Sequence, residues 1–262
     1  MSNSVRLKNM LTALADLAMP RRCIVCGEPL TLRERHLCIS CLADLPRTFF
    51  AGQPRNQMSD RFNALIQQGL EQSGAEGTEP YARAVALFYY RSRTGYREIT
   101  RRLKYHGDFA VGRYFARMLA AEMAASSWFR STDAIVPVPL HWTRRWSRGY
   151  NQAEIIAREL SRSLGVPMRT DILCRVSRTR SQAKLSLEEK ARNVSDAFKL
   201  RERFLRQIHS GRGRKQVLPR RILLVDDVFT TGATLYSCFR AIRKGFSTPV
   251  HIDVATLACV GQ

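Results

Sequence analysis

The chain has 262 residues, of which 45% are hydrophobic, so it can bury one core of ordinary size and carry a small additional module. This content excludes a disordered chain. Lysine and arginine number 43 against 22 aspartates and glutamates, which gives a formal net charge of +21. Such a charge favours an anionic partner, either nucleic acid, a phosphorylated metabolite or an acidic membrane surface, although it also occurs as an aid to solubility.

Hydropathy and cysteine usage bear on the compartment. No run of eighteen or more apolar residues occurs, and the apolar segment 5–19 contains Lys8 and Asp16, so we expect neither a membrane span nor a signal peptide. Four of the seven cysteines form two CxxC pairs, and the other three lie among apolar neighbours, as small core residues do. We therefore expect a reducing, cytoplasmic compartment.

The two CxxC pairs predict a metal site near the N-terminus. Cys23 and Cys26 form the first pair, Cys38 and Cys41 the second, and each tight turn aims two thiolates at one point. Two such turns satisfy tetrahedral zinc, and a closed set of four ligands is structural. His36 is an alternative ligand, but we expect all four cysteines to bind. Two disulfides are disfavoured by the reducing compartment, and a redox CxxC is disfavoured by the second pair.

The chain divides into three parts by composition. Residues 1–50 combine an amphipathic helix, predicted over 5–19, with the cysteine module. Residues 51–80 are polar with few apolar anchors, so we expect a linker, with a helix around 62–70. Residues 81–262 then alternate apolar strands and helical patterns, which predicts an α/β domain.

The first part of this domain has predicted elements of clear pattern. An apolar run predicts a strand over 84–90, and helical spacing predicts a basic helix over 96–104 and a second helix over 109–127. A further apolar strand covers 133–140 and is ended by two prolines.

The loop after that strand carries arginines and amides before a helix at 153–164. Arg145, Arg148 and Asn151 suit a bound anion, for which pyrophosphate is the obvious choice; the alternative is a surface turn with solvated arginines. The carboxyl ends of parallel strands meet at one edge, so this loop should lie beside the loop at 226–234.

Later segments are more basic. A short strand is predicted at 172–175, a mobile basic loop at 177–192 that is a candidate lid, and a closing strand at 251–258. Residues 201–221 hold eight basic residues and one acidic residue, which predicts a solvated insertion; the alternative is a segment that binds a polyanion.

A strand, an acidic pair and a small polar loop follow one another at 222–234. Residues 222–225 form an unbroken apolar run, typical of a strand buried on both faces of a parallel sheet. Asp226 and Asp227 come next, and then a loop of hydroxyl and small residues leads into a helix: Thr230, Thr231, Gly232, Ala233 and Thr234.

Such a loop points backbone amides and hydroxyls at one place at a helix N-terminus, which favours a phosphate. Two carboxylates would repel a phosphate, so we expect them to accept hydrogen bonds from a vicinal diol or to hold a magnesium-bound water. Diol and phosphate together describe a ribose 5-phosphate. The alternative is an ordinary strand-to-helix turn with solvated aspartates and threonine caps.

Taken in order, CxxC…CxxC, VPVPL, RRWSRGYNQAE, RTRSQAKLSLEEKARNVSDAF and ILLVDDVFTTGATL resemble the ComF family of competence and DNA-utilisation proteins. The likeness spans 20–45 and 81–260. The acidic pair with its threonine loop also resembles the phosphoribosyl-pyrophosphate (PRPP) motif of type I phosphoribosyltransferases. Phe229 stands where tyrosine is common, and Lys190 where arginine is common; lysine cannot make a bidentate anion contact.

The resemblance implies a type I phosphoribosyltransferase-like parallel sheet flanked by helices, with a small N-terminal zinc-binding module. It implies that Asp226 and Asp227 hold the ribose hydroxyls, that 230–234 cradle the 5-phosphate, and that the 145–151 loop faces pyrophosphate. Mg²⁺ with PRPP and a structural Zn²⁺ are the cofactors it implies. The partners it implies are PRPP, single-stranded DNA, and proteins of DNA uptake or processing.

Three classes of function remain open, of which a purely structural zinc protein leaves the loop at 230–234 unexplained. One is an active phosphoribosyltransferase, whose acceptor is unknown and for which His106, His141 and Tyr150 are acid–base candidates by residue type alone. Another, which we favour, is an adaptor that binds single-stranded DNA. For stacking on DNA the candidates are aromatic residues near basic ones, although core positions suit them equally: Phe49, Phe50, Trp142 and Trp146.

Overall fold

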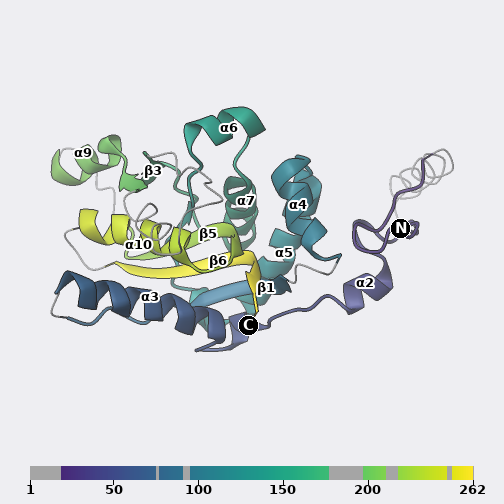
Figure 1. Cartoon of the computed structure of the whole chain (residues 1–262), viewed down its shortest axis with the longest axis horizontal. Helices are drawn as coiled ribbons and strands as arrows, with labels where there is room; N and C mark the ends of the chain where they lie inside the picture. The colour runs from purple at the N-terminus through teal and green to yellow at the C-terminus, as the bar shows by residue number, and fades with distance from the viewer. Residues whose placement is uncertain are drawn as a thin grey trace, which may run out of the picture.

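The computed structural model describes residues 19–74, 77–90, 95–176, 197–210, 218–246 and 250–261, without the side chains of 144, 145, 147 and 208–210. Its centre is a four-stranded, wholly parallel sheet (Figure 1). The strand order is β1 (Ala84–Tyr90), β6 (His251–Val260), β5 (Arg221–Phe229) and β2 (Ala134–Pro137). The predicted N-terminal helix at 5–19 falls almost wholly outside the described residues, as does the predicted loop at 177–192.

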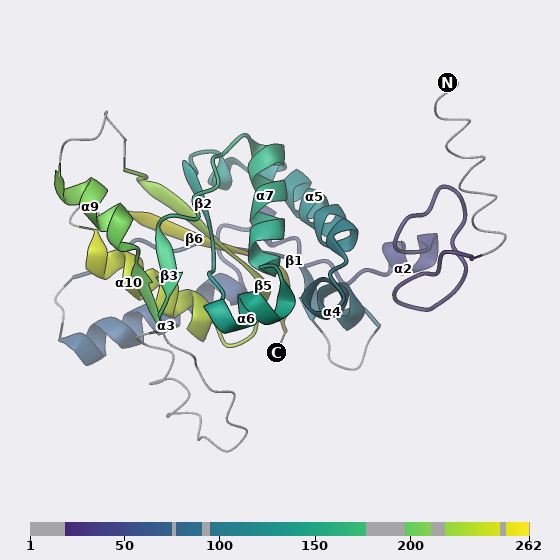
Figure 2. The ribbon, with the colours of Figure 1, turned by 90° about the horizontal axis from the view of Figure 1, so that it is seen from above.

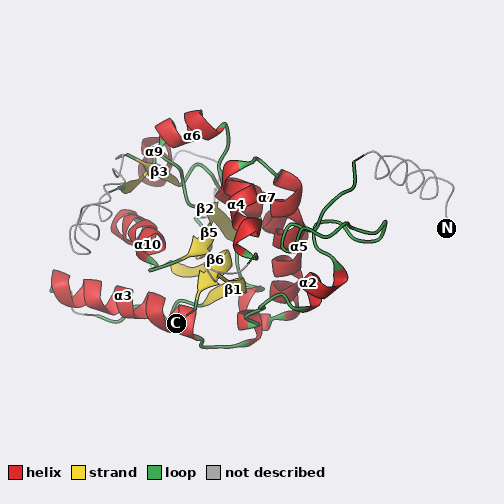
Figure 3. Ribbon diagram, turned by 45° about the vertical axis from the view of Figure 1, so that its right-hand side comes forward, coloured by secondary structure: helices red, strands yellow, loops and turns green. Residues whose placement is uncertain are grey.

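Helices cover both faces of the sheet, which explains why its strands read as apolar runs. One layer contains α3 (Gln57–Ser73) and α10 (Ala233–Gly245), and the other contains α5 (Phe109–Ala125) and α7 (Gln152–Leu164), as Figures 1 and 3 show. The α/β class and the parallel sheet flanked by helices are thereby confirmed, and the arrangement is compatible with a phosphoribosyltransferase-like fold.

The segment 51–80 differs from the expected linker. It contains α3, which is longer at both ends than the helix we expected there and which packs in the layer beside α10. Asn56 begins this helix, since its side chain accepts hydrogen bonds from two amides of the first turn. Phe62 and Ile66 are buried at a spacing of four residues. The polar residues between them suggested a linker because they form the outer face of an amphipathic helix.

A small antiparallel sheet lies beyond β2 in the chain. It pairs β3 (Leu173–Arg175) with β4 (Phe198–Leu200), and α9 (Glu202–Ser210) follows. The predicted insertion at 201–221 is therefore partly anchored, because α9 buries Phe204 against Phe246 at 5.6 Å between ring centroids. The glycine-rich part at 211–217 lies outside the described residues.

The remaining elements are short. They are α2 (Ile39–Ala43), η1 (Phe50–Gly52), α4 (Arg97–Tyr105), η2 (Ser127–Phe129) and α6 (Trp142–Arg148). The helices predicted at 96–104 and 109–127 are confirmed as α4 and α5. None of the described helices has the length and apolar character that crossing a bilayer requires.

Both edges of the sheet are covered by short stretches of extended chain. At β1, the amide of Thr48 donates to the carbonyl of Leu87, and the amide of Tyr89 donates to the carbonyl of Pro46. At β2, the amide of Ile135 donates to the carbonyl of Pro167, and the amide of Arg169 donates to the carbonyl of Ile135. The backbone groups of both outer strands are thus partly satisfied within the chain.

Candidate phosphoribosyl and metal sites

The acidic pair lies inside a strand, not after one. We expected the strand to end at Val225, but β5 continues to Phe229 and still pairs with β6, where Asp226 lies opposite Thr256. The neighbour on the other side, β2, pairs with β5 only as far as Val225. The two carboxylates therefore lie on the part of β5 that extends past the end of β2, at the carboxyl edge of the sheet.

Charge at the pair is partly compensated from α4. Asp227 is only 3% exposed, and its Oδ2 lies 3.3 Å from Nζ of Lys104. That Oδ2 accepts no hydrogen bond within the described residues. The backbone amide of Asp227 donates to Oδ1 of Asp226 at 2.8 Å. Burial and the neighbouring Asp227 raise the pKa of Asp226 to about 8. This shift favours the protonated form of Asp226, and a ligand that donates hydrogen bonds or brings a cation favours the ionised form.

The loop after β5 has the backbone form that an anion site requires. Gly232 caps α10 in the left-handed region, with φ +84°, and a Cβ there would lie 2.7 Å from the ring of Phe229. Gly232 has no side chain to accept from the first turn of α10, and of those amides the one of Ala233 donates to Oγ1 of Thr231 at 3.4 Å. Thr230 and Thr231 are exposed beside it.

The two loops follow β2 and β5, which are parallel neighbours in the sheet. The sequence places Asn151 towards pyrophosphate, but in the structure its side chain is buried and engaged: Oδ1 accepts from the amide of Ala153 at 3.1 Å, and Nδ2 donates to the carbonyl of Val138 at 3.0 Å. Asn151 thereby holds the start of α7 against the end of β2. The guanidinium of Arg148 lies over the ring of Tyr105 at 5.2 Å. The side chain of Arg145 is outside the described set.

Lys104 is a site residue that sequence reasoning missed. Tyr150 holds α4 in place, because its hydroxyl donates to the carbonyl of Leu103 at 2.7 Å and accepts from the amide of Gly107 at 3.0 Å. This contact explains how α4 brings Lys104 to Asp227. No signal singled out Lys104 in the sequence, since the basic segment around it contains arginines with no such contact.

The acid–base candidates chosen by type have structural contacts. The hydroxyl of Tyr150 is engaged with the backbone at the end of α4. His141 is buried, with Nδ1 2.8 Å from the hydroxyl of Thr143. His106 is exposed at the C-cap of α4. A cavity of about 220 Å³ opens beside the end of β2, and its wall includes Leu140 and Trp142.

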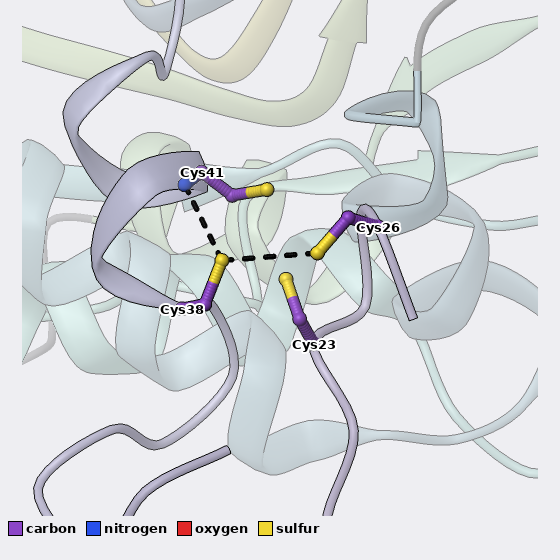
Figure 4. A group of neighbouring side chains, drawn as sticks. All are labelled: Cys23, Cys26, Cys38 and Cys41. Carbon is purple, nitrogen blue, oxygen red and sulfur yellow. Dashed lines mark hydrogen bonds between the residues drawn. The ribbon is translucent and has the colours of Figure 1, made fainter. Parts of the chain in front are cut away.

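The four predicted metal ligands converge. Their sulfur atoms all lie within 4.8 Å of one another, and Sγ of Cys26 is 3.7 Å from Sγ of Cys38 (Figure 4). Four sulfurs bound tetrahedrally at about 2.3 Å from a metal would lie roughly 3.8 Å apart, so the set fits a metal ion. No disulfide joins these cysteines.

The local backbone prepares this cluster for ligation. Cys38 is the N-cap of α2, and its sulfur accepts from the amide of Cys41 at 3.5 Å. Burial opposes ionisation of Cys23, but hydrogen bonds from the amides of Cys26 and Cys38 lower its pKa to about 6. Burial raises the pKa of Cys41. His36 is not part of the cluster; its ring packs 5.2 Å from that of Tyr114.

The aromatic candidates for stacking divide by exposure. Phe50 is buried and belongs to the core, whereas Phe49, Trp142 and Trp146 are 60%, 70% and 88% exposed. Only the last three are therefore available to a partner.

Comparison with known proteins identifies relatives over most of the chain. No protein-family model matches it. The chain is 29% identical over 230 residues to competence protein F of Haemophilus influenzae, which covers 85% of this chain and 91% of that protein. It is 26% identical over 245 residues to the DNA utilization protein YhgH of Salmonella typhi, and 24% identical over 243 residues to that of Escherichia coli K12. Each of these two alignments covers 90% of this chain and 96% of the relative.

Proposed function

We propose that the chain, as a relative of competence protein F and of the YhgH proteins, is a ComF-family protein that binds PRPP with Mg²⁺ and acts in the cytoplasm on DNA taken up from outside. The role would be natural transformation or the use of external DNA. One observation carries the PRPP proposal: an acidic pair, in which Asp227 is buried and Asp226 is partly exposed, and a threonine–glycine loop occupy one strand-to-helix junction.

Each part of PRPP has a suitable group at this junction. The 5-phosphate binds the first-turn amides of α10 and the hydroxyls at 230–234, because partial positive charge and donors coincide there. The ribose hydroxyls donate to Asp226 and Asp227. Asp226 and Asp227 would hold Mg²⁺ directly or through a water, and the ion would supply positive charge that favours the ionised carboxylate. Arg145 and Arg148 face the pyrophosphate.

Calorimetric titration of the full chain with PRPP and Mg²⁺ tests this proposal. Wild type binds, and Asp227→Ala combined with Thr231→Ala abolishes binding. The double variant gains one unit of positive charge, so nonspecific attraction to phosphate would increase, and a loss reports a specific site. The matched control changes an exposed aspartate and an exposed threonine elsewhere, Asp44→Ala with Thr78→Ala, and keeps wild-type affinity. Unchanged affinity in the site variant would remove the proposal.

The metal of the cysteine module is Zn²⁺ in this proposal. Four thiolates in two tight turns suit zinc and leave no open coordination position, so its role is to fold the module. Cys23, Cys26, Cys38 and Cys41 hold it, and the metal takes no part in the chemistry at β5.

Single-stranded DNA is the proposed macromolecular partner. A net charge of +21 favours phosphate backbones, and the exposed rings of Trp142 and Trp146 suit stacking on unpaired bases. Binding should weaken steeply as salt increases, and a single strand should bind better than a duplex at equal salt. Filter binding with single-stranded DNA, duplex DNA and heparin measures both, and equal affinity for all three would reduce the interaction to nonspecific electrostatics.

A second candidate is an active phosphoribosyltransferase. The cavity of about 220 Å³ beside β2 favours it, because an acceptor could lie there next to the edge that carries the acidic pair. In that reaction a nucleophile forms a bond to C1 of the ribose, and the bond to pyrophosphate breaks with its electron pair. Release of pyrophosphate from PRPP with DNA present would support the enzyme, and tight binding without release would support the adaptor.

A further inference from the structure

Exposed aromatic side chains gather on one part of the molecule. Among the described residues, five aromatic side chains are exposed: Phe49, Tyr105, Phe109, Trp142 and Trp146. Four of the five belong to α4, to the first position of α5, and to α6. Exposed tryptophans grouped in this way mark a binding surface more often than chance exposure does.

These elements form one continuous surface. The guanidinium of Arg148 on α6 covers the ring of Tyr105 on α4 at 5.2 Å, and Tyr150 binds the C-terminal turn of α4 through two hydrogen bonds. The ring of Phe109 packs 4.8 Å from that of Tyr150. Figure 2 shows α6 and α4 next to each other. We call Tyr105, Trp142, Trp146 and Arg148 the aromatic rim.

Charge on these two helices suits a polyanion. Together α4 and α6 contain seven basic residues and one acidic residue, Glu98. Glu98 lies 3.4 Å from Arg101 and 4.0 Å from Arg102, so it compensates a small part of this charge. Aromatic faces alternating with guanidinium groups are the surface that unpaired bases on a phosphate backbone require.

The aromatic rim also borders the proposed phosphoribosyl site. On α4, Lys104 contacts Asp227 and is followed directly by Tyr105. On α6, Trp142 forms part of the wall of the cavity at the end of β2. A strand of DNA that lay along α4 would therefore pass next to Lys104 and the acidic pair that it contacts.

We propose that the aromatic rim is the surface on which single-stranded DNA stacks its bases, so that the bound strand lies over the entrance to the phosphoribosyl site. This proposal rests on the proposed function, since it gives a location to the DNA binding proposed there. It places the DNA contact on the α/β domain and not at Phe49, the exposed aromatic residue that precedes η1.

The chain offers a matched pair of positions for the test. Tyr105 and Phe49 are 65% and 60% exposed, and each lies under an arginine, at 5.2 Å for Arg148 and 5.0 Å for Arg47. Phe49 precedes η1, beside β1. The two substitutions Tyr105→Ala and Phe49→Ala therefore remove similar groups from different surfaces.

The experiment measures fluorescence anisotropy of a labelled oligothymidylate with the zinc-loaded full chain, over a series of salt concentrations. Tyr105→Ala and Trp146→Ala should each weaken binding by about tenfold, the loss expected for one stacked base. Their salt dependence should stay at the wild-type slope, because no phosphate contact is removed. Phe49→Ala should bind within twofold of wild type. Circular dichroism of each variant confirms that it folds.

The outcomes separate this inference from the proposed function. If wild type fails to bind the oligonucleotide, the proposed binding of single-stranded DNA and its location on the aromatic rim are both overturned. If wild type binds and the two rim variants bind equally well, DNA binding stands and its location on the rim is overturned. An equal loss in Phe49→Ala also overturns the location, because it would show that exposed aromatic area in general matters.

Discussion

The stability of Asp226→Asn relative to wild type should increase as pH rises, although the substitution removes a proposed ligand group. In the folded protein burial and the neighbouring Asp227 raise the pKa of Asp226 to about 8, from an ordinary value of 3.8. Between these two pH values the folded protein holds a proton that the unfolded chain has released. The free energy of unfolding of wild type therefore falls as pH rises through this range, and an uncharged asparagine lacks this dependence.

The size of the effect follows from the linkage relation. One pKa unit corresponds to about 1.4 kcal/mol, so the ceiling for a change from pH 5 to pH 7 is roughly 2.7 kcal/mol. Asp226 is partly exposed and Lys104 lies near the pair, so we expect about 1–2 kcal/mol. The asparagine keeps Oδ1, which can still accept from the amide of Asp227.

Urea denaturation of wild type and Asp226→Asn at several pH values, with zinc present, measures this difference. Other titrating groups contribute equally to both proteins, so the difference in free energy isolates the acidic pair. Its growth in favour of the variant between pH 5 and pH 7 supports the reasoning. A difference that does not change with pH, or one that shrinks as pH rises, would refute it, because Asp226 would then be ionised in the folded protein.

Other substitutions test the rest of the structure. Phe62→Ala should lower the free energy of unfolding by about 3–5 kcal/mol in urea, because this ring is fully buried on α3; a loss below about 1 kcal/mol would restore a linker at 51–80. Elemental analysis should find one zinc per chain, and Cys38→Ser should lower that content; two disulfides without metal would contradict the site. Gly232→Ala should weaken PRPP binding about tenfold or more, because the added Cβ meets Phe229 at φ +84°; wild-type affinity by calorimetry would contradict this.

Strong periodic signals in the sequence predicted the elements that the structure contains. The apolar runs of β1 and β5 reflect strands that are buried on both faces, and the helical spacing in α5 and α7 reflects helices that are buried on one face. In both cases the order of apolar residues in the sequence follows the pattern of burial. Convergence of the four cysteines was also predictable, because each CxxC turn fixes two of them locally.

Features that depend on distant contacts were not predictable. The helix α3 buries only Met58, Ser59, Phe62 and Ile66 among polar residues, and only its packing in the layer with α10 distinguishes it from a linker. The extension of β5 through Asp226 depends on pairing with β6, which no local pattern encodes. Lys104 reaches Asp227 because Tyr150 fixes α4, and the inward turn of Asn151 depends on the carbonyl of Val138.

The covered edges of the central sheet affect how the protein behaves at high concentration. An open outer strand offers a row of backbone donors and acceptors to a second molecule, and such rows promote aggregation. Here Pro46–Thr48 occupies part of that row on β1, and Pro167–Arg169 occupies part of it on β2. Removal of residues 1–50 to isolate the α/β domain would uncover β1 and invite self-association, so the N-terminal module also serves the solubility of the sheet beside it.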